Sequence, residues 1–319
     1  MSTTHVEHAV TVAAPASAVA AIITDVTSWP LHFPPTVHAE RLDGATGADG
    51  HREERIRIWA MANGLLRTWT SRRRLSADGR RIDFEQVQSQ HPVAAMSGSW
   101  RVEDDEGGCR VRLLHAYAAV DDDPAALALI AAAVDTNSRS ELAALRSSAE
   151  RLAGDDGLLL SFEDTEVMDG TVADAYAFVR DAALWPQRLP HVVRLDLTES
   201  PGGLQVMEMD TRSPDGSVHT TRSGRVCLDD RIVYKQTTPP AALVAHTGRW
   251  TFEQQDGGHV AVTSHHSVII DPDALPTLPV ELRELPRARD AVRHALGSNS
   301  RATLAAAGAH LRSAASSAV

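Results

Sequence analysis

The 319-residue sequence contains only two cysteines, Cys109 and Cys227, which lie in different halves of the chain. Two separated thiols can build neither a disulfide framework nor a cysteine-rich zinc site. We therefore expect a protein of a reducing compartment, the cytoplasm, that holds no metal ion.

Long apolar runs and an excess of basic residues are also missing. No segment approaches the roughly 20 apolar residues of a membrane-spanning helix, and the N-terminus lacks the basic start of a signal peptide. The chain has 31 lysines and arginines against 42 aspartates and glutamates, which gives a formal net charge of -11. This balance argues against nucleic acid or an anionic membrane as partner and leaves small neutral ligands or proteins.

Common nucleotide-binding and hydrolase motifs are absent as well. The sequence has no G-x-G-x-x-G, P-loop or G-x-S-x-G motif, so motif support for dinucleotide, Walker-type phosphate or α/β-hydrolase chemistry is lacking. The pair His265-His266 stands without a cysteine or carboxylate pattern and is a weak zinc signal. With 43% hydrophobic and 23% charged residues, the composition is that of an ordinary packed globular protein.

Three short motifs occur twice in the same order, at a spacing of roughly 150 to 160 residues. The matched pairs are Trp29-Pro30 with Trp185-Pro186, Ser97-Gly98-Ser99-Trp100 with Thr247-Gly248-Arg249-Trp250, and Asn137-Ser138-Arg139 with Asn299-Ser300-Arg301. Short strings recur by chance, but three in one order indicate a tandem duplication. We predict two domains, residues 1–154 and 158–319.

Hydrophobic periodicity predicts the same elements in each copy. Alternation from Val6 to Val12 indicates a strand, the Trp-Pro motifs break short helices, and further alternating segments indicate about six more strands. Helical spacing follows over residues 124–153 and about 282–313, where Pro286 should end or kink the first turn. The predicted fold class is α+β, with a curved antiparallel sheet on a long helix and a possible cavity between them.

The first copy resembles the polyketide aromatase/cyclases of bacterial aromatic polyketide pathways. The matching segments are His5 to Pro15, Phe33-Pro34-Pro35-Thr36, Thr68 to Arg73, Met96 to Trp100 and Asn137-Ser138. The second copy resembles the family more loosely, so the chain looks like a di-domain member. The resemblance implies two helix-grip domains of the START/Bet v 1 type, each with an internal pocket.

The resemblance also implies a reaction. The expected substrate is a poly-β-ketone chain on an acyl carrier protein, and the expected chemistry is aldol closure of the first ring, between C7 and C12, followed by dehydration. A minimal polyketide synthase and a ketoreductase are the implied partners, and no cofactor is required. The alternatives from other classes are a hydrophobic-ligand carrier or chaperone of the same fold, and a scaffold of the synthase complex.

By resemblance, the catalytic residues are Arg73, His115 and Glu141, the last at a position that is normally aspartate. Strand alternation puts Arg73 on the face of Trp69, and His115 on an apolar face with Leu113. The alternatives are that the arginine run is a solvated strand edge, that His115 is a core residue, and that Glu141 lies on the surface.

Further side chains are expected to contact the substrate: Trp29, Phe33, Trp69, Met96, Trp100, Tyr117, Arg222, His265 and His266. Aligned through Trp250, the counterpart of Arg73 is Ser223, beside Arg222, and that of His115 is His265, although strand phase favours His266. Aligned through Asn299, Thr303 replaces Glu141. We expect chemistry mainly in the first copy; the alternative is that the second copy performs the dehydration.

An acidic acyl carrier protein would be repelled by a net charge of -11 unless arginines gather locally. Two groups of arginines are candidates for such a patch: Arg52, Arg55 and Arg57, and Arg72 to Arg74.

Overall fold

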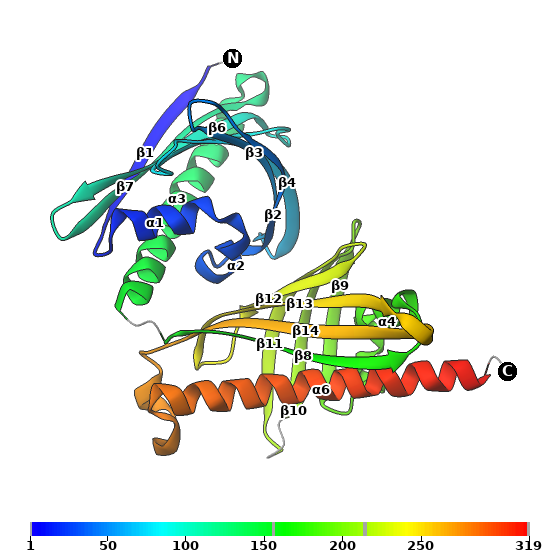
Figure 1. Ribbon diagram of the computed structural model, residues 1–319. Coiled ribbons are helices and arrows are strands. Elements are labelled where there is room, and N and C mark those ends of the chain that lie inside the picture. Colours follow the sequence, from blue (N-terminus) through cyan, green and yellow to red (C-terminus); the bar gives the residue numbers. More distant parts are fainter. Residues whose placement is uncertain (1, 155–156, 213–215, 318–319) are drawn as a thin grey trace. The chain divides into compact units, whose positions relative to one another are not determined.

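The computed structural model describes residues 2–154, 157–212 and 216–317. The chain divides into two compact units. Unit 1 comprises Met1–Ala60 and Arg67–Asp156, and unit 2 comprises Met61–Leu66 and Gly157–Val319. Each unit contains one seven-stranded antiparallel sheet and one long helix (Figure 1).

The sheet of unit 1 has the strand order β1-β7-β6-β5-β4-β3-β2, so the first strand closes against the last. Its elements are β1 (Thr4–Val12), α1 (Ala16–Thr24), α2 (Trp29–His32), β2 (Thr36–Thr46), β3 (Arg52–Ala62), β4 (Leu65–Leu75), β5 (Arg81–Gln86), β6 (Val93–Asp105), β7 (Gly108–Ala119) and α3 (Pro124–Gly154). The strands curve around α1, α2 and α3 (Figure 1). The element order is the one that the periodicity predicts.

The core of unit 1 forms between the concave face of the sheet and the helices. Helix α3 buries Val134, Ser138, Leu142 and Leu145, which recur at steps of three and four residues on one helix face. Leu145 is fully buried, and such burial stabilises a protein by about 1.5–3 kcal/mol per large apolar side chain. This face of α3 therefore fixes which helix residues point toward the sheet.

Unit 2 repeats this arrangement with the strand order β8-β14-β13-β12-β11-β10-β9. Its elements are β8 (Leu159–Asp169), α4 (Val172–Arg180), α5 (Trp185–Arg188), β9 (Val192–Ser200), β10 (Leu204–Arg212), β11 (Val218–Cys227), β12 (Arg231–Thr238), β13 (Leu243–Gln255), β14 (His259–Ile270) and α6 (Leu285–Ser317). Helix α6 runs along one side of this sheet (Figure 1).

The start of α6 differs from the sequence-based expectation. The helix begins at Leu285 rather than near residue 282, so Pro286 occupies its first turn. A proline there neither removes an intrahelical hydrogen bond nor clashes with a preceding carbonyl. A separate helical turn, Val280–Leu282, precedes α6, so the chain does break before Pro286, which then lies second in the helix.

In the part of the chain that the structure describes, no helix combines the length and the apolar character that crossing a bilayer requires. Both cysteines are free thiols, Cys109 buried and Cys227 half-buried.

Candidate active site

Each unit places a histidine on the inner face of its sheet, directly opposite a glycine of the neighbouring strand. His115 of β7 pairs with Gly98 of β6, and His266 of β14 pairs with Gly248 of β13. A Cβ atom at Gly98 would collide with the ring of Phe84, and one at Gly248 with the ring of Tyr234. The glycines therefore let an aromatic ring lie across the strand beside each histidine.

His115 is half-buried and has one hydrogen-bonding neighbour. Its Nδ1 lies 3.3 Å from Oγ of Ser138 on α3, and the ring of Phe84 meets it edge-on at 5.6 Å. Burial, aided by the nearby His8, lowers the pKa of His115 to about 4, so the ring is neutral at pH 7. A neutral ring that donates from Nδ1 to Ser138 leaves the lone pair of Nε2 free to accept a proton.

Glu141 follows Ser138 by three residues on α3, so the two side chains are neighbours on one helix face. Its half-buried carboxyl makes no hydrogen bond or ion pair with the residues that the structure describes. Burial raises the pKa of Glu141 to about 7. A carboxyl group with this pKa can give and take a proton near neutral pH, which is the property of a general acid.

A second polar contact joins β1 to α3 beside His115. Nε2 of His8 lies 2.8 Å from Oδ1 of Asp135, and Asp135 also accepts from Arg139. Arg139 first, and then His8, lower the pKa of Asp135 to about 2. The residues Asp135, Ser138 and Glu141 thus form a polar row on α3 that faces the edge of the sheet.

Arg73 lies on the face of Trp69, as strand alternation predicts, and this face is the inner one, but its hydrogen bonds go to the protein. Nε donates to Oε1 of Glu54 at 3.0 Å, Nη1 donates to the carbonyl of Ile23 at 2.9 Å, and Nη2 donates to that of Thr24 at 2.9 Å. The guanidinium also lies 5.3 Å from the ring centre of Trp29. With 2% of its surface exposed, Arg73 ties β3, β4 and the end of α1 together rather than offering donors to a ligand.

Glu54 is the buried centre of this cluster. Its carboxylate contacts Arg73 and also Arg41, at 2.6 Å, and Arg52, at 3.2 Å, while its own side chain is fully buried. Burial lowers the pKa of Arg73, although Glu54 opposes the shift, and an arginine stays charged under both influences. A buried carboxylate with several arginine partners is a structural ion cluster.

The other expected contact residues of unit 1 divide into two groups. Phe33, Trp100 and Tyr117 are 3%, 6% and 1% exposed, so they pack in the core and offer almost no surface to a ligand. Trp29, Trp69 and Met96 are half-buried, like Phe84 and His115. These side chains keep part of their surface accessible, unlike the first group.

The counterpart of Arg73 in unit 2 is Arg225, which corrects the alignment to Ser223. Arg225 is 1% exposed, donates to Oε1 of Gln205 and to the carbonyl of Val179, each at 2.7 Å, and lies over Trp185. Residues 76–80 separate β4 from β5, whereas only residues 228–230 separate β11 from β12, so the register shifts by two residues. Arg222 is exposed and points away from the inner face.

The counterpart of His115 is His266, as strand phase predicts, and not His265. His265 points to the opposite face, where its Nδ1 lies 3.0 Å from Oε2 of Glu163. The turn between β13 and β14 is one residue longer than that between β6 and β7, which displaces the alignment through Trp250. His265 therefore does not occupy the position that the alignment assigned to it.

The inner site of unit 2 is closed by its own hydrogen bonds. Nδ1 of His266 lies 3.1 Å from the hydroxyl of Tyr234 and 2.9 Å from Nε2 of His246. Its Nε2 lies 2.6 Å from Oγ of Ser300 and 3.2 Å from Oγ of Ser264. Burial lowers the pKa of His266 to about 4 and raises that of Tyr234, so both side chains are neutral at pH 7.

The carboxylic acid of unit 1 has no counterpart in unit 2. Thr303 stands where unit 1 has Glu141, and its hydroxyl donates to the carbonyl of Asn299 at 3.0 Å. Among the described residues of both units, no group of three or more His, Cys, Asp or Glu side chains is arranged to hold a metal ion.

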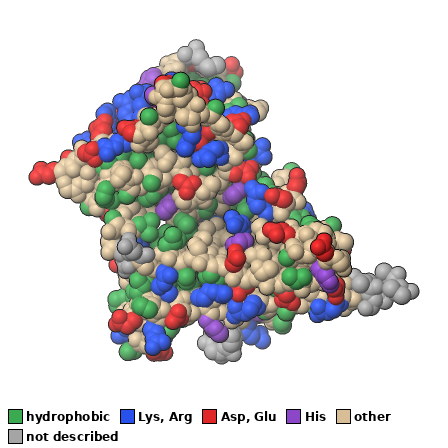
Figure 2. Space-filling view, viewed as in Figure 1, with side chains coloured by type: hydrophobic (Ala, Val, Ile, Leu, Met, Phe, Trp, Pro, Cys, Tyr) green, Lys and Arg blue, Asp and Glu red, His purple; other side chains and the backbone are tan. Residues whose placement is uncertain are grey.

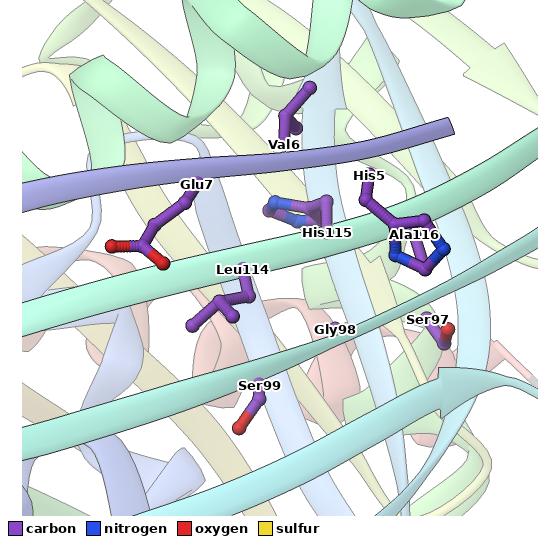
Figure 3. Close-up of a pocket in the computed structure, with 9 residues that line it drawn as sticks. All are labelled: His5, Val6, Glu7, Ser97, Gly98, Ser99, Leu114, His115 and Ala116. Atoms are coloured by element: carbon purple, nitrogen blue, oxygen red, sulfur yellow. The ribbon is translucent and has the colours of Figure 1, made fainter. Parts of the chain in front are cut away.

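A shallow groove of about 380 Å³ lies along the edge of the unit 1 sheet (Figure 3). It crosses β1, β7 and β6, and the side chains of Glu7, Ser99 and Leu114 contribute to its lining. Alternation along the strands points Leu114 away from the direction of His115. His115 and Gly98 also line this groove, whereas Glu141 and Phe84 do not, so the groove shares part of its lining with the inner site.

The arginines that were expected to form a docking patch are largely paired with carboxylates. Arg52 contacts Glu54, Arg55 contacts Asp43, Arg72 contacts Glu85, and Arg74 contacts Asp49, while Arg57 lies over Trp59. These groups therefore supply little unpaired positive charge. The expectation that they form a positive patch is not supported by these contacts.

Several functional candidates were missed by the sequence reasoning. Glu54 shares the inward phase of Ile56 and Ile58 on β3, and Ser138 stands four residues from both Val134 and Leu142 on α3. The inward phase of these two polar residues is the sequence signal that could have identified them. The partners themselves, such as Ser138 with His115, become visible only when α3 packs on β7.

Comparison with known proteins agrees with this architecture. A family described as "Polyketide cyclase / dehydrase and lipid transport" matches residues 3–150. The granaticin polyketide synthase bifunctional cyclase/dehydratase of Streptomyces virginiae is 45% identical over 311 residues, which cover 97% of this chain and 100% of that protein. The actinorhodin polyketide synthase bifunctional cyclase/dehydratase of Streptomyces coelicolor is 43% identical and covers 94% of each chain.

A solved structure extends the similarity to three dimensions. The crystal structure of the di-domain ARO/CYC BexL from the BE-7585A biosynthetic pathway matches with a TM-score of 0.87 and 49% sequence identity. The match covers 97% of this chain and 98% of that one. Since sequence and fold agree over both units, the chain belongs to the family of di-domain polyketide aromatase/cyclases, and it is a polyketide cyclase/dehydratase of the helix-grip fold.

Proposed function

We propose that unit 1 closes the first ring of a poly-β-ketone chain, between C7 and C12, and removes the water that aromatises it. The observation that carries this proposal is Glu141, an unpartnered carboxyl with a pKa of about 7, set one helical turn from the Ser138 that contacts neutral His115. An acid and a base are thus available on one inner face at neutral pH.

In the proposed aldol step, Nε2 of His115 accepts a proton from a methylene flanked by two carbonyls. The resulting enolate carbon attacks a ketone carbon further along the same chain, and a carbon–carbon bond forms. The new alkoxide takes up the proton that His115 accepted and becomes a hydroxyl, which returns the imidazole to its neutral form. The ring closure consumes no net proton and needs no oxidant, so the side chains of unit 1 suffice.

In the proposed dehydration, Nε2 of His115 removes the proton on the carbon beside the new hydroxyl. Glu141 donates its proton to the hydroxyl oxygen, the carbon–oxygen bond breaks, and water departs. The carboxylate then recovers a proton from solvent or from the histidine. An acid with a pKa near the working pH suits this role because it is protonated in part and still donates well.

We assign Arg73 a positioning role. Its hydrogen bonds to Glu54, Ile23 and Thr24 hold β3, β4 and α1 around the site, and its contact with Trp29 orients an aromatic side chain of the lining. A substrate oxygen would have to replace these bonds to reach the guanidinium. This assignment departs from the catalytic role that the family resemblance implied for Arg73.

We propose an acyl carrier protein as the bearer of the chain, with a minimal polyketide synthase and a ketoreductase as partners. The support is the similarity to proteins named for the granaticin and actinorhodin polyketide synthases. Unit 2, which lacks the acid, is proposed to support the fold or the binding of the chain. The cytoplasmic location stays a prediction from the sequence.

The test is product analysis with a reconstituted minimal synthase and ketoreductase. Glu141→Gln and His115→Ala should each lower the yield of correctly cyclised aromatic product, by about 100-fold or more if general acid–base catalysis is lost. Thr303→Val in unit 2 is the matched control and should leave the yield unchanged. Glu141→Gln and His115→Ala are also tested for folding and ligand binding. If both variants fold, bind ligand and give the wild-type product, the proposal fails and the carrier function takes its place.

A further inference from the structure

In both units the residues around the inner histidine are paired across the strands in the same way. Phe84 pairs with Gly98, which pairs with His115, and Tyr234 pairs with Gly248, which pairs with His266. Each aromatic ring meets its histidine edge-on, at 5.6 Å and 71° in unit 1 and at 6.3 Å and 77° in unit 2. The units therefore provide an internal comparison in which only a few side chains differ.

Two of these differences decide what Nδ1 of the histidine can bond. Phe84 stands where unit 2 has Tyr234, and Met96 stands where unit 2 has His246, because each lies in the same register relative to the central glycine. In unit 2, Tyr234 and His246 both reach Nδ1 of His266. The phenyl ring of Phe84 has no hydrogen-bonding atom, and the thioether of Met96 is only a weak acceptor.

The orientation of the imidazole changes accordingly. The serine of the long helix contacts Nε2 in unit 2, where Ser300 lies at 2.6 Å, but Nδ1 in unit 1, where Ser138 lies at 3.3 Å. In unit 2 both ring nitrogens are occupied. In unit 1, Nε2 has no hydrogen-bond partner among the residues that the structure describes, and Phe84 is the aromatic neighbour of the ring.

We propose that Phe84 and Met96 are positioning residues that keep Nε2 of His115 available to substrate, and that this pair determines why unit 1 rather than unit 2 is competent for proton transfer. The proposal rests on the catalytic role of His115 proposed above. In this proposal the two apolar side chains act because they form no hydrogen bond with the imidazole. A tyrosine and a histidine at these positions would capture the imidazole as they do in unit 2.

The experiment installs the unit 2 residues in unit 1 of the full-length protein. Phe84→Tyr, Met96→His and the double variant are assayed with the reconstituted synthase and ketoreductase. We expect kcat to fall by about tenfold in each single variant, equivalent to about 1.4 kcal/mol, and further in the double variant, with KM nearly unchanged. Nitrogen-15 spectra of the His115 ring should show a changed tautomer or hydrogen-bonding state.

Tyr234→Phe is the matched control, because it makes the reverse change at the equivalent position of unit 2 and should leave kcat unchanged. Thermal unfolding shows whether each variant folds. If Phe84→Tyr does not fold, Met96→His carries the test alone. Folded variants with full kcat and an unchanged His115 spectrum overturn the inference.

The companion variant His115→Ala separates the two proposals. If His115→Ala abolishes turnover while Phe84→Tyr and Met96→His do not affect it, the inference fails and the proposed function stands. If His115→Ala itself retains turnover, the proposed function of His115 fails, and the inference falls with it.

Discussion

At the scale of single residues, one physical cause shifts the pKa values of the two proposed catalytic groups in opposite directions. Burial disfavours the charged form of any side chain, so it lowers the pKa of His115 to about 4 and raises that of Glu141 to about 7. Both groups are therefore neutral in part or in full near pH 7. An available base lone pair and an available acid proton then coexist on one inner face.

These pKa values predict a bell-shaped dependence of kcat on pH. In the proposed mechanism His115 must be neutral, so kcat should fall as the pH drops through about 4. Glu141 must hold its proton there, so kcat should fall as the pH rises through about 7. Glu141→Gln should lower kcat and remove the alkaline limb. An alkaline limb that persists in folded Glu141→Gln would assign that limb to another group.

Adjacent arginines on β4 should differ in their effect on stability. Arg73→Met leaves Glu54 buried with fewer partners and should lower the free energy of unfolding by about 3 kcal/mol. Arg72→Met removes an exposed pair with Glu85 and should change it by less than about 1 kcal/mol. Urea unfolding measures both. A stable Arg73→Met protein that has lost turnover would contradict the positioning role and restore a catalytic one.

At the scale of elements, differences in turn length explain why the sequence alignment of the two copies missed equivalent residues. The hairpin turns β4–β5 and β11–β12 differ by two residues, and β6–β7 and β13–β14 by one, so a fixed displacement misplaces the arginine and the histidine. Once the strands are paired, Arg73 matches Arg225 and His115 matches His266. The long helices carry the remaining difference, with Glu141 in α3 and Thr303 in α6.

The glycine of β6 provides a test of this register. Gly98→Ala places a methyl group against the ring of Phe84 and the carbonyl of Leu114, and such overpacking should cost about 1–3 kcal/mol of stability. The displaced ring should also lower kcat. Ser97→Ala, the preceding position on the same strand, is the control and should be nearly neutral. Equal stability of the two variants, measured by thermal unfolding, would show that the ring does not lie across Gly98.

At the scale of the whole molecule, surface charge bears on how a partner is recognised. Positive and negative side chains are interspersed on the face shown in Figure 2, and the net charge is -11. Arg101 and Arg110, on β6 and β7, make no hydrogen bond or ion pair with the described residues. They are therefore better placed than the paired arginines to meet an acidic partner.

Charge reversal tests this at the level of binding. Arg101→Glu combined with Arg110→Glu should weaken binding of an acyl carrier protein by roughly threefold to tenfold at low salt and by less at high salt. Arg55→Glu, which disturbs an arginine already paired with Asp43, is the comparison and should have the smaller effect. Equal effects of the two changes in a titration assay would remove the special role of Arg101 and Arg110.

The sequence alone determined the duplication, the element order, the α+β class and the family, because these depend on periodicity and on motifs that are local in the chain. It also placed Arg73 on the face of Trp69 and preferred His266 over His265. Tertiary structure alone decided that Glu54 holds Arg73, that Ser138 meets His115, and that Phe84 and Met96 leave the imidazole open. These contacts join segments distant in sequence, and their register depends on turn lengths and helix packing that no local pattern encodes.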